Sequence, residues 1–240
     1  MAVAKARKLR QTLDAKVGVT LSFFCAESPA TAGTMALLEK MGVRPESVTN
    51  LRYRGEGWPG HFAPVKLGEQ QPAGKLTYQE SWAFLQKYRP WSVHLWPDGS
   101  GELADISCGD PWYEQPDGVN PGSSLVVVRT ERGKEILRQA MRTGYLTLTP
   151  AKPWKLGRSQ SNLASKRAAT WGRLLVMRLF GLPVPRFSGA PLFRCWLSLP
   201  LKEKLKSTIG TARRIFQRKL YRRLQLDKAT AVLVKGRPGR

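Results

Sequence analysis

A succession of strand, helix and strand signals between residues 125 and 149 constrains the fold of this chain more than any other feature. Four consecutive apolar residues, Leu125–Val128, predict a buried strand because most of them are β-branched. Thr130 then provides a good N-cap for a helix that runs through Met141. Gly144 ends this helix, and residues 145–149 predict another strand. The succession indicates a mixed α/β domain.

Hydrophobic periodicity and the positions of Gly and Pro predict the other elements. These are a buried strand at Val17–Phe24, a helix at Gly33–Met41, a strand at Val48–Tyr53, a helix at Thr77–Tyr88 with Trp82 and Leu85 on one face, and a strand at Leu103–Ser107. Residues 64–75 are rich in Pro, Gly and Gln and predict an exposed loop. The helix after Thr130 is expected to bury a stripe of Ile136, Leu137, Ala140 and Met141.

Charge divides the chain into two parts. Residues 1–150 contain 18 Lys or Arg and 15 Asp or Glu, whereas residues 151–240 contain 22 and 2. We therefore expect an α/β domain over 1–150, with a mixed sheet and flanking helices, followed by a basic, mostly helical extension over 151–240. Such an extension suggests phosphate, nucleic acid or an anionic membrane surface as its neighbour, or simply a solvated or partner-covered face.

One segment of the basic extension predicts a cationic amphipathic helix. Phe216, Leu220 and Leu224 recur every fourth residue among arginines and lysines. This pattern suits a helix that lies in a membrane interface. Nucleic acid is a weaker expectation because no recognised binding module is present. The function class that follows is a non-enzymatic basic adaptor, which we keep as an alternative.

Cysteine, histidine and hydropathy patterns exclude several other classes. Cys25, Cys108 and Cys195 lie far apart without a CxxC pair, so spacing indicates no metal site. An odd cysteine number without a secretory signal suits a reducing compartment, and we expect a cytoplasmic protein, with peripheral attachment at the inner membrane face as an option. His61 and His94 are interpreted as structural residues, and no nucleophile–base pair supports hydrolase chemistry.

The segment LRYRGEGWPG has the composition of a binding loop. Arg52 and Arg54 alternate on a predicted strand, so their side chains are expected on one face, where both grip the same phosphate or carboxylate. The glycines admit a ligand close to the backbone and Trp58 offers a stacking face; these glycines are Gly55, Gly57 and Gly60. The alternative is a tight turn beside an aromatic core residue.

A second candidate segment, ADISCGDPW, is followed by Arg129 and Thr130. Asp105 lies in an apolar strand and needs hydrogen bonds if it is buried; it would orient an arginine or accept from a ligand hydroxyl. Asp110 starts a turn that Trp112 closes, and it either binds ligand or only caps that turn. Arg129 stands where a strand opens into a helix, a place that favours anions; the alternative is an exposed arginine.

Four motifs in fixed order carry a family resemblance. LSFFC, LRYRGEGWPG, GELADISCGDPW and GSSLVVVRTERG resemble the C-terminal domain of the coenzyme F420 hydrogenase/dehydrogenase beta subunit family. That family also includes chlorophyll-pathway reductases, and a bacterial subgroup occurs with polysaccharide genes. The resemblance covers roughly residues 1–150, and the basic extension looks like that of the bacterial subgroup.

The resemblance implies an FAD-binding α/β domain that relays electrons between an iron–sulfur donor and a two-electron acceptor. A ferredoxin or a separate iron–sulfur subunit would be the electron-donor partner. The cofactor-binding residues expected on this basis are Arg52, Arg54, Gly55, Gly57, Trp58, Gly60, Asp105, Ser107, Gly109, Asp110, Arg129 and Thr130. Catalytic residues are not assigned.

Two departures from the family pattern change the expectation. Relatives have a CxxC pair before the PDG turn, where this chain has Val93 and Trp96. Cys25 matches a family cysteine, but one thiolate cannot hold an iron–sulfur cluster, so we expect no cluster here. The chain also begins where the family's N-terminal ferredoxin-like region would have ended, so we expect a truncated, partner-dependent oxidoreductase.

Overall fold

The computed structural model of the chain describes residues 15–25, 28–114 and 122–222. The chain divides into two compact units, residues 1–167 and 168–240. The domain boundary expected at residue 150 stays a prediction. The expected fold class is confirmed, because a mixed sheet with helices precedes a helical C-terminal region.

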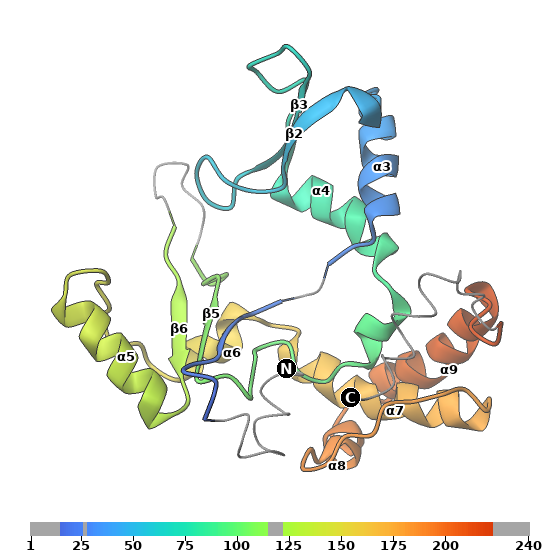
Figure 1. Cartoon of the computed structure of the whole chain (residues 1–240). Helices are drawn as coiled ribbons and strands as arrows, with labels where there is room; N and C mark the ends of the chain where they lie inside the picture. The colour runs from blue at the N-terminus through green and yellow to red at the C-terminus, as the bar shows by residue number, and fades with distance from the viewer. Residues whose placement is uncertain (1–14, 26–27, 115–121, 223–240) are drawn as a thin grey trace, which may run out of the picture. The chain divides into compact units, whose positions relative to one another are not determined.

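The first unit combines short strands with helices (Figure 1). Its strands are β1 (Leu21–Phe23), β2 (Val48–Arg52), β3 (His61–Lys66), β4 (Leu76–Thr77), β5 (Ile106–Gly109) and β6 (Leu125–Val128). Its helices are α3 (Thr31–Lys40), α4 (Tyr78–Leu85), α5 (Glu131–Arg142) and α6 (Trp154–Ser159), with short 3-10 turns η1 (Pro45–Ser47), η2 (Gln86–Tyr88) and η3 (Trp91–Leu95).

Two three-stranded sheets organise this unit. One has the order β1-β5-β6, with β1 parallel to β5 and β5 antiparallel to β6. The other has the order β2-β3-β4 and is antiparallel throughout. Parallel pairing of β1 with β5 joins segments 85 residues apart, with Leu21 opposite Ile106. In the sequence, the β2-β3-β4 sheet and its helices therefore lie between β1 and β5, two paired strands of the mixed sheet.

Helices α3 and α4 form a core with the β2-β3-β4 sheet. Buried apolar side chains of the two helices, of Val43 after α3 and of Phe62 in β3 make one cluster: Leu37, Leu38, Val43, Phe62 and Leu85. α4 begins with a capping box, in which Thr77 Oγ1 accepts from the Glu80 backbone N–H and the Glu80 carboxylate accepts from the Thr77 N–H. The helices predicted over 33–41 and 77–88 are thus confirmed, the second ending as the turn η2.

The prediction of an exposed loop over residues 64–75 is wrong for its first residues. Residues 61–66 form β3, the middle strand of its sheet, and Phe62 and Ala63 are almost completely buried. Pro64 argues against a strand in sequence because it lacks a backbone N–H. In the structure Pro64 stands opposite Leu51 and its carbonyl accepts from the Ala73 N–H.

Three expectations about burial and strands are also wrong. Residues 145–149 form no strand in the structure. The strand predicted at 17–24 is only three residues long, and its Leu21 and Phe23 are 70% and 71% exposed. The helix predicted after Thr130 exists as α5, but only Gly133 of that helix is buried, whereas Ile136 and Met141 are partly exposed. Small-residue contact, rather than an apolar stripe, attaches α5 to its sheet.

The second unit is helical. α7 (Leu163–Leu179) begins in the first unit, and α8 (Leu192–Leu197) and α9 (Leu201–Gln217) follow. Trp171 of α7 packs on Trp196 of α8, with ring centroids 4.7 Å apart. α9 ends at Gln217, so the helix predicted through Leu220 and Leu224 stops early; Leu224 lies outside the described residues. Within the described part of the chain, no helix is long and apolar enough to cross a membrane.

Two glycine-to-alanine substitutions, one in α5 and one in α6, are expected to have opposite effects on stability. A Cβ at Gly133 would lie 2.8 Å from the Asp105 carbonyl oxygen, so Gly133→Ala is expected to destabilise the unit by about 1–3 kcal/mol. A Cβ at Gly157 in α6 meets nothing within 4 Å, so Gly157→Ala is expected to stabilise by about 0.5–1 kcal/mol. Urea unfolding measures both, and a neutral Gly133→Ala variant would contradict the close contact.

Candidate functional site

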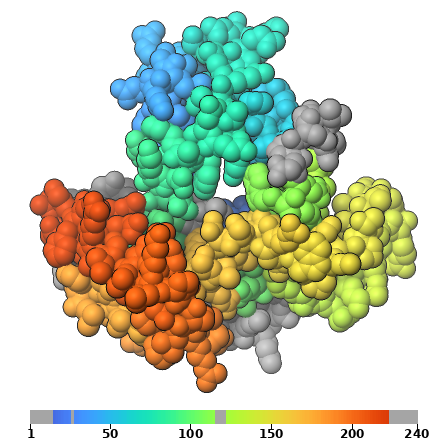
Figure 2. Space-filling view, turned by 180° about the vertical axis from the view of Figure 1, so that it is seen from behind, coloured from blue at the N-terminus to red at the C-terminus, as the bar shows by residue number. Residues whose placement is uncertain are grey.

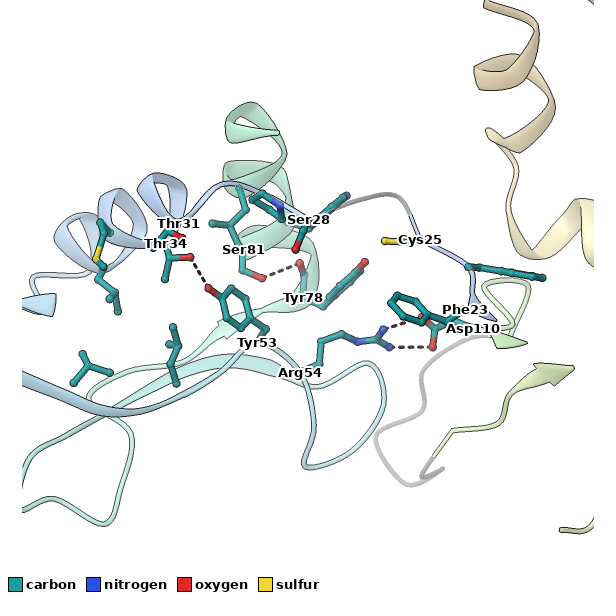
Figure 3. A pocket seen from close by; sticks show the side chains of 18 of the residues that line it. Phe23, Cys25, Ser28, Thr31, Thr34, Tyr53, Arg54, Tyr78, Ser81 and Asp110 are labelled. Carbon is teal, nitrogen blue, oxygen red and sulfur yellow. Dashed lines mark hydrogen bonds and ion pairs between the residues drawn. The ribbon is translucent and has the colours of Figure 1, made fainter. Parts of the chain in front are cut away.

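A cavity of about 730 Å³ lies in the first unit (Figure 3). Its wall is formed by the ends of β1 and β5, the start of α3, the chain just after β2 and the first turns of α4. Arg54, Asp110 and Cys25, which the sequence motifs single out as family positions, line it together with Trp112. A cavity of this size suits a small-molecule ligand or cofactor.

The pair of Arg54 and Asp110 joins the two sides of this cavity. Arg54 Nη1 donates to Asp110 Oδ2 at 2.8 Å and Nη2 donates to Oδ1 at 3.1 Å, a bidentate pair between residues 56 apart in sequence. The hydrogen bond with Asp110 raises the pKa of Arg54. Trp58 Nε1 donates to the same Oδ1 at 3.3 Å. Three residues predicted from two separate motifs therefore meet in one cluster.

Aromatic rings stack beside the Arg54 guanidinium. Tyr78 and Trp112 are stacked with centroids 5.1 Å apart, and the Arg54 guanidinium lies 5.1 Å from the first ring and 5.7 Å from the second. The Trp58 ring packs on Trp112 at 5.3 Å, and Tyr78 stacks on Trp82 at 6.4 Å. Aromatic rings favour flat conjugated rings as neighbours, and the Arg54 guanidinium that lies over them is held by Asp110.

Tyr78 was not among the predicted site residues, although it lines the cavity and contacts Arg54. Burial raises the pKa of its phenol, and Asp110 raises it further, while Arg54 opposes both. Tyr78 is the first residue of α4, directly after the Thr77 N-cap. The signal that could have found it is an aromatic residue at a capped helix start, where the side chain faces the preceding loop.

The far wall combines polar and apolar groups from α3. α3 begins at Thr31 on the cavity wall, and Ala30, its N-cap, makes no side-chain cap hydrogen bond in the described structure. Thr34 and Tyr53 hydrogen-bond through their hydroxyls, as Figure 3 shows. Tyr53 also packs edge-on against Phe62 of the core, which fixes this wall. Sequence reasoning missed Thr34 and Tyr53, whose residue types carry no special signal.

The glycines of the loop after β2 allow the tight turns of that loop. Gly55, Gly57 and Gly60 all have positive φ, and Gly55 and Gly60 form a bridge. A Cβ at Gly60 would lie 2.2 Å from the Gly55 nitrogen, so only glycine fits there. Arg52 forms an ion pair with Glu56 inside this loop and does not line the cavity. Arg52 and Arg54 therefore have different partners, unlike the shared grip expected from strand alternation.

Asp105 is buried in the mixed sheet, away from the cavity lining. Its Oδ2 accepts from the Thr20 N–H at 2.7 Å and from Thr20 Oγ1 at 2.6 Å, and its Oδ1 accepts from Thr130 Oγ1 at 2.8 Å. Thr130 Oγ1 in turn accepts from the Gly133 N–H and caps α5. These contacts give Asp105 and Thr130 structural partners. Their binding role stays a prediction.

The remaining predicted residues also have partners in the mixed sheet. Arg129 donates to Ser107 Oγ and, at 3.3 Å, to the Ser100 carbonyl. Ser107 is completely buried. A Cβ at Gly109 would clash with the Phe24 ring, so this glycine lets Phe24 pack on β5. Arg129, Ser107 and Gly109 do not line the cavity, and their predicted cofactor contacts stay predictions.

The described residues offer no ready metal centre. Within them, no group of three or more His, Cys, Asp or Glu side chains is placed to hold a metal ion. Cys25 lines the cavity, and burial raises the pKa of the Cys108 thiol. Val93 lies in η3 and Trp96 follows its end, and neither side chain supplies a thiolate.

The raised pKa of Tyr78 predicts a pH effect on stability. The folded chain keeps this phenol protonated at a pH where the unfolded chain has lost the proton, so this contribution to stability declines as the pH rises above about 10. Tyr78→Phe is expected to reduce the loss of unfolding free energy between about pH 9 and about pH 11. Urea unfolding at the two pH values measures the free energy of unfolding of each variant. Tyr145→Phe is the control, because the Tyr145 side chain is 83% exposed.

Comparison with known proteins assigns the family. A family model for the C terminus of the coenzyme F420 hydrogenase/dehydrogenase beta subunit matches residues 1–153. The coenzyme F420 hydrogenase subunit beta of Methanothermobacter thermautotrophicus (strain Delta H) is 26% identical over 174 residues, covering 71% of this chain and 56% of that protein. The protein of the same name from Methanococcus voltae is 28% identical over 176 residues, covering 70% and 55%.

The chain thus spans about half the length of the curated relatives it matches. The matched region contains β1 to β6 and α3 to α5, and so the cavity, apart from Gln160, and both motifs that form the Arg54–Asp110 pair. This chain belongs to the coenzyme F420 hydrogenase/dehydrogenase beta subunit family, of which it carries the C-terminal domain.

Proposed function

We propose that this chain is a flavin-dependent oxidoreductase domain that binds FAD in the cavity around Arg54. The observation that carries the proposal is the Arg54 guanidinium, held by Asp110, beside the stacked rings of Tyr78 and Trp112 on one cavity wall. FAD is a dinucleotide with two phosphates and flat rings. The cavity offers one kind of contact for each.

The phosphate side of the proposal rests on charge and backbone. Arg54 is 39% exposed, and Asp110 and the Pro59 carbonyl take three of its five N–H donors, which leaves two for phosphate oxygens. The start of α3 at Thr31 adds the N-terminal end of a ten-residue helix to the wall. Helix N-termini favour phosphate through their unpaired N–H groups and dipole. Both features line the same cavity and would contact the phosphates of FAD.

The ring side rests on the aromatic residues. Tyr78 and Trp112 would contact and orient the flavin ring, and Leu38, Leu51 and Leu85 would exclude water from the deeper part of the cavity. A bound flavin supplies transfer of electrons singly or as hydride. The chain's residues bind and orient the cofactor. No proton-transfer residue is assigned.

The proposed reaction depends on partner proteins. The relatives are named as subunits of a hydrogenase, and the chain matches only part of each. We infer that an electron-donor protein, a ferredoxin or a separate iron–sulfur subunit, exchanges electrons with the flavin and that a two-electron acceptor completes the reaction.

Cys25, Cys108 and Cys195 form no disulfide, which suits the reducing cytoplasm. We also propose a role in polysaccharide biosynthesis, because the basic extension resembles that of the bacterial subgroup that occurs with polysaccharide genes.

Flavin binding predicts different effects for two arginines that are two residues apart. Arg54→Gln removes the guanidinium that lines the cavity and is expected to weaken FAD binding about tenfold. Arg52→Gln alters an arginine paired with Glu56 outside the cavity and is expected to change affinity less than about twofold. Quenching of FAD fluorescence on titration with each protein measures affinity. A folded parent chain that binds no FAD would overturn the proposal, and equal losses in both variants would place FAD elsewhere.

Iron content tests the second part of the proposal. Because Val93 and Trp96 replace the family CxxC, anaerobic reconstitution with iron and sulfide is expected to leave no stoichiometric cluster in this chain. Iron is counted colorimetrically after gel filtration. A cluster that survives filtration would show that this chain needs no separate iron–sulfur partner.

A further inference from the structure

Helix α9 of the second unit carries an exposed apolar stripe. Leu201, Leu205, Ile209, Ala212 and Phe216 are spaced by four, four, three and four residues, so they share one face of the helix. Leu201 is 71% exposed, Ile209 is 64% and Phe216 is 58%. Large apolar side chains exposed together in this way mark an interaction surface.

The core of the second unit uses a different face of α9. Ser207, Thr211 and Ile215, spaced by four residues, are almost completely buried. Ser207 Oγ would lie 2.4 Å from a Cβ at Gly172 of α7, so the two helices approach closely there. Trp196 of α8 donates to the same hydroxyl at 3.0 Å. The exposed stripe therefore remains after the helices have packed.

A row of cations borders the stripe. Lys202, Lys206 and Arg213 follow Leu201, Leu205 and Ala212 by one position each, which places them along one edge of the stripe, and all three are exposed. Residues 168–222 contain twelve Lys or Arg and one acidic residue, Glu203. Figure 2 shows the orange-red atoms of the C-terminal helical unit, to which α9 belongs.

Aromatic rings close the C-terminal end of the stripe. Phe180 packs edge-on against Phe216 at 5.5 Å, and Tyr221 lies 6.4 Å from Phe216. All three are exposed by 44% or more. Amphipathic tyrosine and other aromatic rings are favoured where apolar and aqueous phases meet.

We propose that α9 attaches this protein peripherally to an anionic lipid bilayer. The apolar stripe would enter the boundary between headgroups and acyl chains, with the helix parallel to the surface, while Lys202, Lys206 and Arg213 contact lipid phosphates. Charge complementarity selects this occupant: an acid-poor helix with a long apolar face fits an anionic surface that also has an apolar interior. A nucleic acid would satisfy the cations and leave the stripe in water. This inference is independent of flavin binding.

Vesicle sedimentation of the full chain tests the proposal. Vesicles of equal parts phosphatidylcholine and phosphatidylglycerol are expected to bind the protein, and phosphatidylcholine alone is expected to bind at least about tenfold more weakly. Raising the salt from about 0.1 M to about 0.5 M is expected to reduce binding because it screens the lysines and arginines. Equal binding to both vesicles, or to neither, would overturn the proposal.

Matched substitutions separate the α9 stripe from exposed apolar residues in general. Leu205→Gln with Ile209→Gln is expected to lower vesicle affinity about tenfold or more, because both side chains lose apolar burial. Ile136→Gln with Met141→Gln changes two exposed apolar residues of α5 and is expected to change affinity less than about twofold. Circular dichroism checks that both variants keep their helices.

The remaining outcomes also decide the proposal. Equal losses in the two double variants would overturn it, because a specific role for α9 would then be lost. Binding to single-stranded RNA that is tighter than binding to the mixed vesicles, and unaffected by Leu205→Gln with Ile209→Gln, would assign the basic unit to nucleic acid instead. The double variant Leu205→Gln with Ile209→Gln is expected to keep its FAD affinity whether α9 binds lipid or not. A failure of the membrane proposal can therefore be told apart from a failure of the flavin proposal.

Discussion

One buried carboxylate, Asp105, ties together the segments of the mixed sheet. Its side chain accepts hydrogen bonds from Thr20, just before β1, and from Thr130, which caps α5 after β6. Its backbone continues the same links, since its N–H donates to the Thr20 carbonyl and its carbonyl accepts from the Arg129 N–H. A buried carboxylate without such donors would be strongly destabilising. The position of β5, and of Asp110 just beyond it, therefore depends on Asp105.

The Arg54–Asp110 pair then joins the end of β5 to the segment after β2, and this contact forms one side of the cavity. Asp110 directly follows β5 of the mixed sheet, whereas Arg54 follows β2 of the other sheet. Their bidentate contact, with Trp58 on the same carboxylate, brings two motifs that are separate in the sequence to one place. The pair is partly exposed, so its contribution to stability is modest, about 1 kcal/mol at most. Its larger effect is to place a guanidinium over Tyr78 and Trp112.

Local signals predicted helices better than strands. The N-cap Thr130 and the box at Thr77 and Glu80 are contained in a few consecutive residues, and the sequence identified both helices. Strands depend on partners far along the chain, so residues 145–149 form no strand despite their alternating pattern, and Pro64 concealed β3. The site shows the same limit: Arg54, Trp58 and Asp110 were identifiable by type, but Tyr53 and Tyr78 gained their positions only from tertiary packing.

Strand alternation failed for Arg52 and Arg54 for a definite reason. β2 ends at Arg52, so the period-two rule that would align both side chains no longer applies at Arg54. Arg52 is neutralised by Glu56 within the loop, and Arg54 is neutralised by Asp110 across the site. Both arginines thus have counter-charges. The first unit, residues 1–167, contains 23 Lys or Arg and 15 Asp or Glu, whereas the second unit, residues 168–240, contains 17 and 2. Long-range attraction to anions therefore originates mainly in the second unit, while the cavity of the first unit selects its ligand by shape and short-range contact.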